Sequence, residues 1–78
     1  MDGIGENIRK IRMLLGIKQA VMAGMLDVSV NTYGKMERNE IRIRPERLTE
    51  IAVIFNIKPD YIINLELLLE QVQANRSG

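Results

Sequence analysis

The segment Lys18–Asn39, KQAVMAGMLDVSVNTYGKMERN, constrains the fold more than any other part of the chain. Its apolar residues Met22, Ala23 and Leu26 recur at the spacing of one helix face. The triplet Asp-Val-Ser at 27–29 interrupts this pattern, and a serine is a good N-cap for a second helix. The sequence therefore predicts two short helices joined by a tight corner.

The second predicted helix, residues 29–37, has two different faces. Tyr33 and Met36 are three residues apart, and we expect both side chains to point inward. The opposite side carries small, polar and basic residues, namely Val30, Asn31, Gly34 and Lys35. A helix face of this kind, held against another helix, has the size and chemistry that the major groove of DNA accepts.

The net charge of +1 conceals an uneven distribution along the chain. Residues 9–47 contain nine basic and four acidic residues, which gives this segment a net charge of +5. Residues 48–78 contain two basic and four acidic residues, a net charge of −2. This polarity suits a molecule with one face on an anionic polymer and the other face in solvent or on a partner.

The composition argues against several classes of protein. Cysteine and histidine are both absent, which excludes disulfides, soft-metal sites and histidine catalysis. We find no glycine-rich phosphate loop and no combination of nucleophile, base and orienting residue, so we expect neither an enzyme, a cofactor nor a metal. No apolar run approaches the length of a membrane span, and residues 1–10 lack the pattern of a signal peptide. We therefore expect a cytoplasmic protein that does not bind membranes.

The flanking segments predict three more helices and no sheet. A first helix is expected over residues 3–15, with Gly16 as its left-handed stop. The alternating segment 40–44, EIRIR, could form a short strand, but a loop is favoured because Pro45 restricts the residue before it and opens a helix over 45–55. Asn56 ends that helix, and Pro59 begins a fifth and longer one. The predicted fold is all-α, with five helices.

The fifth predicted helix carries an apolar seam. Its members are spaced three, four and three residues apart, as in a coiled coil: Ile62, Leu65, Leu69 and Val72. Two interpretations remain open, a homodimer interface or packing on the first helix of the same chain. We expect residues 1–64 to form the core domain, 65–78 to extend the last helix, and the end from Gln73 onward to fray.

Three short patterns resemble the Cro-repressor-type helix-turn-helix proteins, the XRE or lambda-repressor-like family. They are Gln19-x-x-x-Ala23, Leu26-x-Val28-Ser29 and Thr32-x-x-x-Met36-Glu37. The resemblance extends from about residue 4 to residue 63. It implies a five-helix domain in which the paired helices bind double-stranded DNA.

The resemblance and the side-chain chemistry together nominate a set of DNA-binding residues. The resemblance implies a phosphate contact for Gln19, and Asn31 and Lys35 have the hydrogen-bonding groups that recognise adenine and guanine. Val30 could meet a thymine methyl group. The complete set is Gln19, Ser29, Val30, Asn31, Thr32 and Lys35, with Arg42 and Arg44 of the following loop as phosphate contacts. The resemblance further implies a partly buried ion pair between Arg12 and Glu37.

The chain departs from the family pattern at several positions. Lys18 stands where a capping Ser or Thr is usual, so we expect the following helix to begin without a side-chain cap. Asp27 and Asn39 stand where glycine is usual, and both tolerate positive φ better than most residues. The outward face of the first paired helix is apolar where charges are expected, and its members are Ala20, Val21, Gly24 and Met25.

Two functions agree with these observations. The first is a sequence-specific DNA-binding regulator, a repressor that acts as a homodimer on a palindromic operator. The second is a protein-interaction module, such as an antitoxin or anti-repressor, whose apolar helix faces mask a partner protein.

Overall fold

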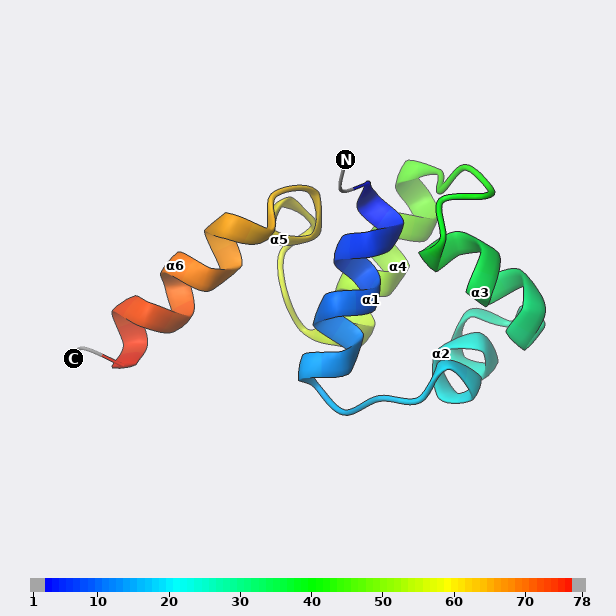
Figure 1. Ribbon diagram of the computed structural model, residues 1–78, viewed down its shortest axis with the longest axis horizontal. Helices are drawn as coiled ribbons and strands as arrows, with labels where there is room; N and C mark the ends of the chain where they lie inside the picture. The colour runs from blue at the N-terminus through cyan, green and yellow to red at the C-terminus, as the bar shows by residue number, and fades with distance from the viewer. Residues whose placement is uncertain (1–2, 77–78) are drawn as a thin grey trace.

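The computed structural model describes residues 3–76, and these fold into six α-helices without a strand (Figure 1). The helices are α1 (Ile4–Leu14), α2 (Gln19–Leu26), α3 (Val30–Glu37), α4 (Pro45–Phe55), α5 (Pro59–Ile63) and α6 (Leu65–Arg76). The all-α prediction is confirmed, and the segment 40–44 is a loop, as favoured. None of the helices in this range is long and apolar enough to cross a membrane.

The helices end at the residues that tolerate a left-handed backbone. Gly16 has φ 70°, and the three non-glycine residues Asp27, Asn39 and Asn56 have φ of 57°, 60° and 57°. The polar residues at 27 and 39 therefore adopt the left-handed conformation for which glycine is usual, as expected from their short side chains. These left-handed residues fix where α2 and α4 stop and where the loop after α3 begins.

The two paired helices begin differently. Ser29 Oγ accepts a hydrogen bond of 3.0 Å from the backbone N–H of Thr32, which is the predicted N-cap of α3. Lys18 precedes α2 in an extended conformation and provides no side-chain cap. The N–H groups at the start of α2 consequently lack a side-chain acceptor at the cap position.

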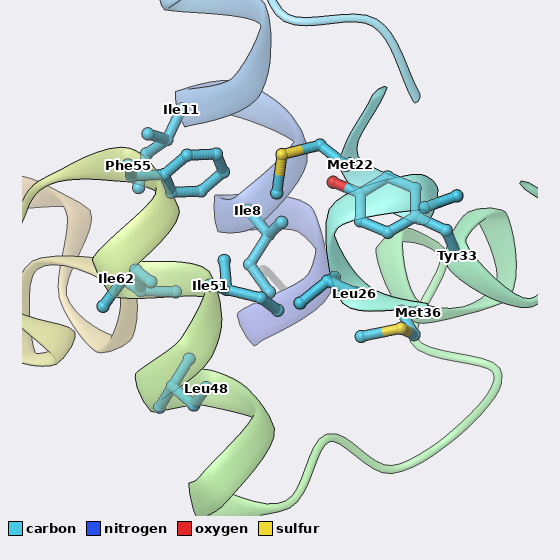
Figure 2. Packing of buried hydrophobic residues seen from close by; sticks show 12 residues of the cluster. Ile8, Ile11, Met22, Leu26, Tyr33, Met36, Leu48, Ile51, Phe55 and Ile62 are labelled. Atoms are coloured by element: carbon cyan, nitrogen blue, oxygen red, sulfur yellow. The ribbon is translucent and has the colours of Figure 1, made fainter. Parts of the chain in front are cut away.

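One hydrophobic core joins α1 to α5. Figure 2 shows Ile8 of α1, Leu26 of α2 and Ile51 of α4 at its centre, with Tyr33 of α3 and Ile62 of α5 at opposite ends. Its buried members are Ile8, Ile11, Met22, Ala23, Leu26, Tyr33, Met36, Leu48, Ile51, Ala52, Phe55 and Ile62.

Polar contacts hold α1 against α3 and α5. The backbone N–H of Gly5 donates to Oδ1 of Asn39 at 2.9 Å, and the Asn7 side chain donates to the Ile62 carbonyl at 2.8 Å. A Cβ at Gly5 would lie 2.0 Å from the Met36 carbonyl oxygen, so no side chain fits there. The start of α1 therefore lies directly on the end of α3.

The predicted fifth helix is divided in two, which corrects the expectation of five helices. Asn64 has an extended backbone (φ −127°, ψ 96°), and its Oδ1 accepts a hydrogen bond of 3.1 Å from the N–H of Glu66. Asn64 thus acts as an N-cap that starts α6. Helix α6 extends away from the other helices (Figure 1) and continues to Arg76, so it includes residues 73–76 of the expected tail. Residues 77–78 of the expected tail lie outside the described range.

This division changes the apolar seam. Ile62 lies on α5 and is 0% exposed within the core, so it is not available to a second chain. Leu65 packs partly against the core. Leu69 and Val72 are each 46% exposed on α6. Of the four predicted seam residues, only these two present a largely open surface.

Candidate nucleic-acid interface

Helix α3 packs on α2 and α1 with one side and leaves the other side open. Tyr33 and Met36 are buried, as expected for the inward face. Val30 is 48% exposed, Asn31 is exposed and Lys35 is partly exposed. The structure therefore brings these three predicted recognition residues together on the outer side of one helix.

Ser29 and Thr32 lie at the start of the same helix. Their hydroxyl groups are 3.0 Å apart in a hydrogen bond, and the Ser29 oxygen also caps the backbone. Both side chains are thereby held at the N-terminal end of α3. This is the end of a recognition helix that enters the groove first in helix-turn-helix proteins.

An ion pair fixes α3 relative to α1. Arg12 Nε lies 2.6 Å from Oε2 of Glu37, and its Nη2 donates to Oε1 at 3.2 Å. A third bond runs from Nη1 to the Ile17 carbonyl at 2.8 Å, so the guanidinium also holds the segment between α1 and α2. The side chains are 12% and 1% exposed, respectively. The predicted pair of Arg12 and Glu37 is present, and its carboxylate is fully buried.

The neighbours of Glu37 keep its carboxylate ionised despite its burial. Burial alone would raise its pKa, but hydrogen bonds from Arg12 and Gln19 favour the charged form, and the pKa is lowered from its usual 4.5. The carboxylate in turn raises the pKa of Arg12. Both groups therefore remain charged at neutral pH.

Gln19, the first residue of α2, reaches toward α3. Its Nε2 donates to Oε1 of Glu37 at 2.9 Å. The amide is partly exposed and stands at a helix N-terminus, where backbone N–H groups favour an anion. The structure gives Gln19 an anchor on α3 while the side chain remains accessible.

Tyr33 occupies the same buried region. Burial raises the pKa of its hydroxyl far above the usual value, and the nearby Glu37 carboxylate adds to this effect. Within residues 3–76 its oxygen lies in no hydrogen bond of regular geometry, although the carboxylate is close. The phenol is therefore neutral and acts as a packing group.

The loop after α3 brings several arginines toward the recognition helix. Arg42 and Arg44 are exposed, and neither side chain has a hydrogen-bond or ion-pair partner among residues 3–76. A shallow cleft of about 210 Å³ joins this loop to Thr32. Arg47 of α4 lines the same cleft and donates from Nη1 to the Leu26 carbonyl at 2.9 Å and to Glu50 at 3.3 Å. The sequence did not predict that Arg47 donates a hydrogen bond to the carbonyl of the last residue of α2.

The position of Gly34 differs from the sequence-based expectation. We expected it on the open face of α3, but it is buried, because the side chain of Arg38 lies across it. Arg38 itself is 55% exposed and pairs with Glu40. Arg38 was not among the predicted DNA-binding residues. Its signal in the sequence is its spacing of four from the glycine, on the same side of the helix.

The chemistry of this surface follows from the kinds of groups that it presents. Among residues 3–76, no group of three or more acidic side chains could hold a metal ion. The shared features of the surface are an open helix, cationic loop residues and a helix N-terminus. These are the components of an interface with a phosphate-bearing, base-displaying polymer.

Comparison with known proteins supports this description. Residues 8–62 match the profile of a protein family described as helix-turn-helix. The crystal structure of the P22 c2 repressor in complex with a synthetic operator (9T, in the presence of Tl⁺) is 31% identical, with a TM-score of 0.70 over 82% of this chain and 97% of that chain. The solution structure of the P22 c2 repressor DNA-binding domain is 33% identical, with a TM-score of 0.72 over 78% and 80% of the two chains. No curated protein sequence matches.

Proposed function

Because this chain belongs to the Cro-repressor-type (XRE) helix-turn-helix family, we propose that it is a transcriptional repressor that binds a specific double-stranded DNA sequence as a homodimer. The observation that carries the proposal is the exposed side of α3, where Asn31 and Lys35 stand on a helix fixed by a buried ion pair. Both similar structures described above are of the P22 c2 repressor, one of them in complex with a synthetic operator.

The base contacts are assigned by side-chain chemistry. The carboxamide of Asn31 pairs with the N6 and N7 edge of adenine, and the ammonium of Lys35 reaches the N7 and O6 acceptors of guanine. Val30, which is 48% exposed, meets a thymine methyl group. Ser29 and Thr32, at the N-terminal end of α3, contact the DNA backbone or the first base step.

The phosphate contacts surround that helix on two sides. Gln19 contributes its side-chain amide together with the N–H groups at the start of α2, which lack a side-chain cap. Arg42 and Arg44 contribute two exposed charges from the loop after α3. These contacts set the register of the protein on the duplex and carry no sequence information themselves.

A second copy is needed for useful specificity. The recognition helix has only eight residues and reads a few base pairs. Helix α6 supplies exposed apolar residues for self-association, Leu69 and Val72. The groove between α1 and α6 adds Met13 and Leu14, which are 56% and 71% exposed. We accordingly propose that residues 1–64 form the DNA-binding domain and that the extension 65–78, together with the α1 side of this groove, forms the dimer contact.

Charge complementarity favours a second copy as the occupant of this groove. Its edge carries Arg9 and Lys10, and the exposed side of α6 carries Glu66 and Glu70. A twofold axis would place the acidic side of one α6 near the basic edge of the other copy. The two recognition helices would then lie about 34 Å apart, one turn of DNA, and would require a palindromic operator.

Enrichment of random DNA duplexes on the purified chain tests the proposal. We expect a single enriched motif consisting of two inverted half-sites whose centres are about 10 base pairs apart. Enrichment of a single asymmetric half-site would contradict the homodimer but retain DNA binding. Uniform binding to all duplexes, with no preferred sequence, would contradict the proposal that the chain is a sequence-specific repressor.

One observation favours a second function, that of a protein-interaction module such as an antitoxin. The outer side of α2 is apolar and open, with Val21 47% and Met25 63% exposed. Patches of this kind often mark protein interfaces. If α2 masks a partner, co-expression with the product of the adjacent gene should give a stable complex that Met25→Lys disrupts. A purified chain that binds its operator but forms no such complex would rule this function out.

A further inference from the structure

Gly34 is the least expected residue of the recognition helix. A glycine inside a helix lowers helix stability relative to alanine, so its presence in an eight-residue helix calls for a structural reason. Gly34 has an ordinary helical backbone, since its φ is not positive. The reason must therefore be space, not backbone conformation.

The space beside Gly34 holds the guanidinium of Arg38. A Cβ at position 34 would lie 3.0 Å from Nη1 of Arg38, 3.8 Å from Cζ and 3.9 Å from Nη2. Even an alanine would thus press on the charged group. The absence of a side chain lets the arginine fold back along α3 toward its N-terminus by about one turn, roughly 5 Å.

This conformation places the Arg38 charge among the recognition residues. Asn31, Lys35 and Arg38 follow one another at intervals of four and three, which is the spacing of one helix face. A long helical side chain ordinarily leans toward the N-terminus of its helix, and a glycine four positions earlier leaves the arginine room to do so. Folded over Gly34, the fifth of the eight residues of α3, its guanidinium lies beside the middle of the helix instead of beyond its end.

Glu40 contacts the Nε edge of this group. Nε of Arg38 donates to Oε2 of Glu40, and the two side chains are 55% and 50% exposed. Within residues 3–76, the terminal nitrogens Nη1 and Nη2 donate to no acceptor. A guanidinium held through Nε presents its two amino groups side by side, the geometry that pairs with N7 and O6 of guanine.

We propose that Arg38 is a further base-reading residue, which recognises guanine in the major groove, and that Gly34 and Glu40 position its guanidinium. This inference rests on the proposed DNA-binding function. It adds one guanine to each half-site, distinct from the guanine assigned to Lys35. It also gives Gly34 a role in specificity without any contact to a base.

The test compares the sequence preferences of the unsubstituted chain and four variants, Arg38→Lys, Arg38→Ala, Gly34→Ala and Lys35→Ala, by enrichment of random duplexes. Arg38→Lys keeps the charge but removes the paired amino groups, so the preference for one guanine per half-site should fall about 5- to 150-fold while the other positions of the motif are unchanged. Gly34→Ala should lower the same preference by a smaller amount, because a Cβ 3.0 Å from Nη1 makes the guanidinium shift by a few tenths of an ångström, with helix content equal or higher. Lys35→Ala, the matched control, should lose preference at a different base pair and retain this one.

Other results would overturn the inference. If Arg38→Lys and Gly34→Ala keep every base preference, or if Arg38→Ala lowers affinity for all duplexes equally and makes the salt dependence shallower, Arg38 contacts a phosphate. Failure of the unsubstituted chain to enrich any sequence would overturn the proposed function together with this inference. An enriched motif that is insensitive to substitution at both Gly34 and Arg38 would overturn this inference alone and leave the proposed function intact.

Discussion

Nε2 of Gln19 donates a hydrogen bond of 2.9 Å to Oε1 of Glu37, which joins the first residue of α2 to the last residue of α3. The same carboxylate receives two hydrogen bonds from Arg12 of α1. One buried group therefore holds three helices together. It also orients the amide that we assign to a DNA phosphate, so the fold and the interface share this hydrogen bond.

Substitution of Gln19 should separate its two roles. Gln19→Ala removes one hydrogen bond to a charged group, which is worth about 1.5–3 kcal/mol where the bond is made. We expect weaker binding to specific and nonspecific duplexes alike. Because the side chain carries no charge, the slope of affinity against salt concentration should not change. A gel-shift titration at several salt concentrations measures both quantities, and a change of base preference would contradict the assignment.

Removal of Arg12 should destabilise the fold strongly. Arg12→Ala leaves the 1% exposed Glu37 carboxylate without its main partner, and breaking a buried pair from one side costs about 3–5 kcal/mol. In a domain of this size we expect Tm to fall by more than about 10 °C. Arg9→Ala is the matched control on the same helix. Arg9 lies 3.8 Å from Glu6 with both side chains well exposed, so its removal should change stability by less than about 1 kcal/mol.

The pH dependence of stability follows from the lowered pKa of Glu37. A carboxyl group whose pKa is lower in the folded than in the unfolded protein contributes stability above its unfolded value, here 4.5, and loses it as the pH falls through the folded value. Denaturant titrations between pH 7 and pH 3 should therefore show a decrease that begins below about pH 5. Glu37→Gln should remove the part of the decrease in stability that is due to protonation of Glu37. Glu50→Gln, at an exposed carboxylate, should leave it unchanged.

Much of this arrangement is predictable because local chemistry determines it. Ser29 caps α3, and Asp27 and Asn39 take the left-handed conformation that their short polar side chains tolerate. The pairing of Arg12 with Glu37 followed from the family resemblance and is present. The cap and the left-handed residues depend on neighbours within one helical turn, and the ion pair is implied by the family resemblance. A single sequence is therefore enough to predict them.

The missed features depend on contacts between distant segments. The segment around Asn64 contains neither proline nor glycine, so the apolar spacing suggested one long helix. The helix is divided because the Ile62 carbonyl accepts a hydrogen bond from Asn7, 55 residues away in the sequence. The Ile62 side chain is also buried in the core. The burial of Gly34 likewise depends on the rotamer of Arg38, which spacing alone does not specify.

The helix and loop residues should differ in the kind of DNA contact that they make. Asn31→Ala and Lys35→Ala should each reduce discrimination at one base pair by about 1–3 kcal/mol. Arg42→Ala and Arg44→Ala should weaken binding to all sequences, and each should lower the salt slope by about 1 because one phosphate is no longer neutralised. Competition gel shifts with single-base operator variants measure the first effect. If the loop variants changed base preference and the helix variants did not, the two roles would be reversed.

The last prediction concerns assembly through α6. Full burial of an apolar side chain is worth about 1.5–3 kcal/mol, and roughly half of that remains available at the half-exposed Leu69 and Val72. Each contact occurs twice across a twofold axis, so these residues offset a substantial part of the cost of association. Leu69→Glu with Val72→Glu should therefore give a folded monomer with weak half-site binding and little affinity for the full palindrome.

Leu67 provides the matched control for this experiment. Leu67 is 39% exposed. It lies on nearly the opposite side of α6 from Leu69, because two residues turn a helix by about 200°. Leu67→Glu adds one of the same charges to the same helix and is compared with Leu69→Glu alone as well as with the double variant, yet it should leave both the dimer and palindrome binding intact. Sedimentation at micromolar to high micromolar concentrations distinguishes the variants. An unsubstituted chain that is monomeric throughout that range would show that α6 is not a dimer interface in free solution, and a dimer resistant to both α6 substitutions would move the interface elsewhere.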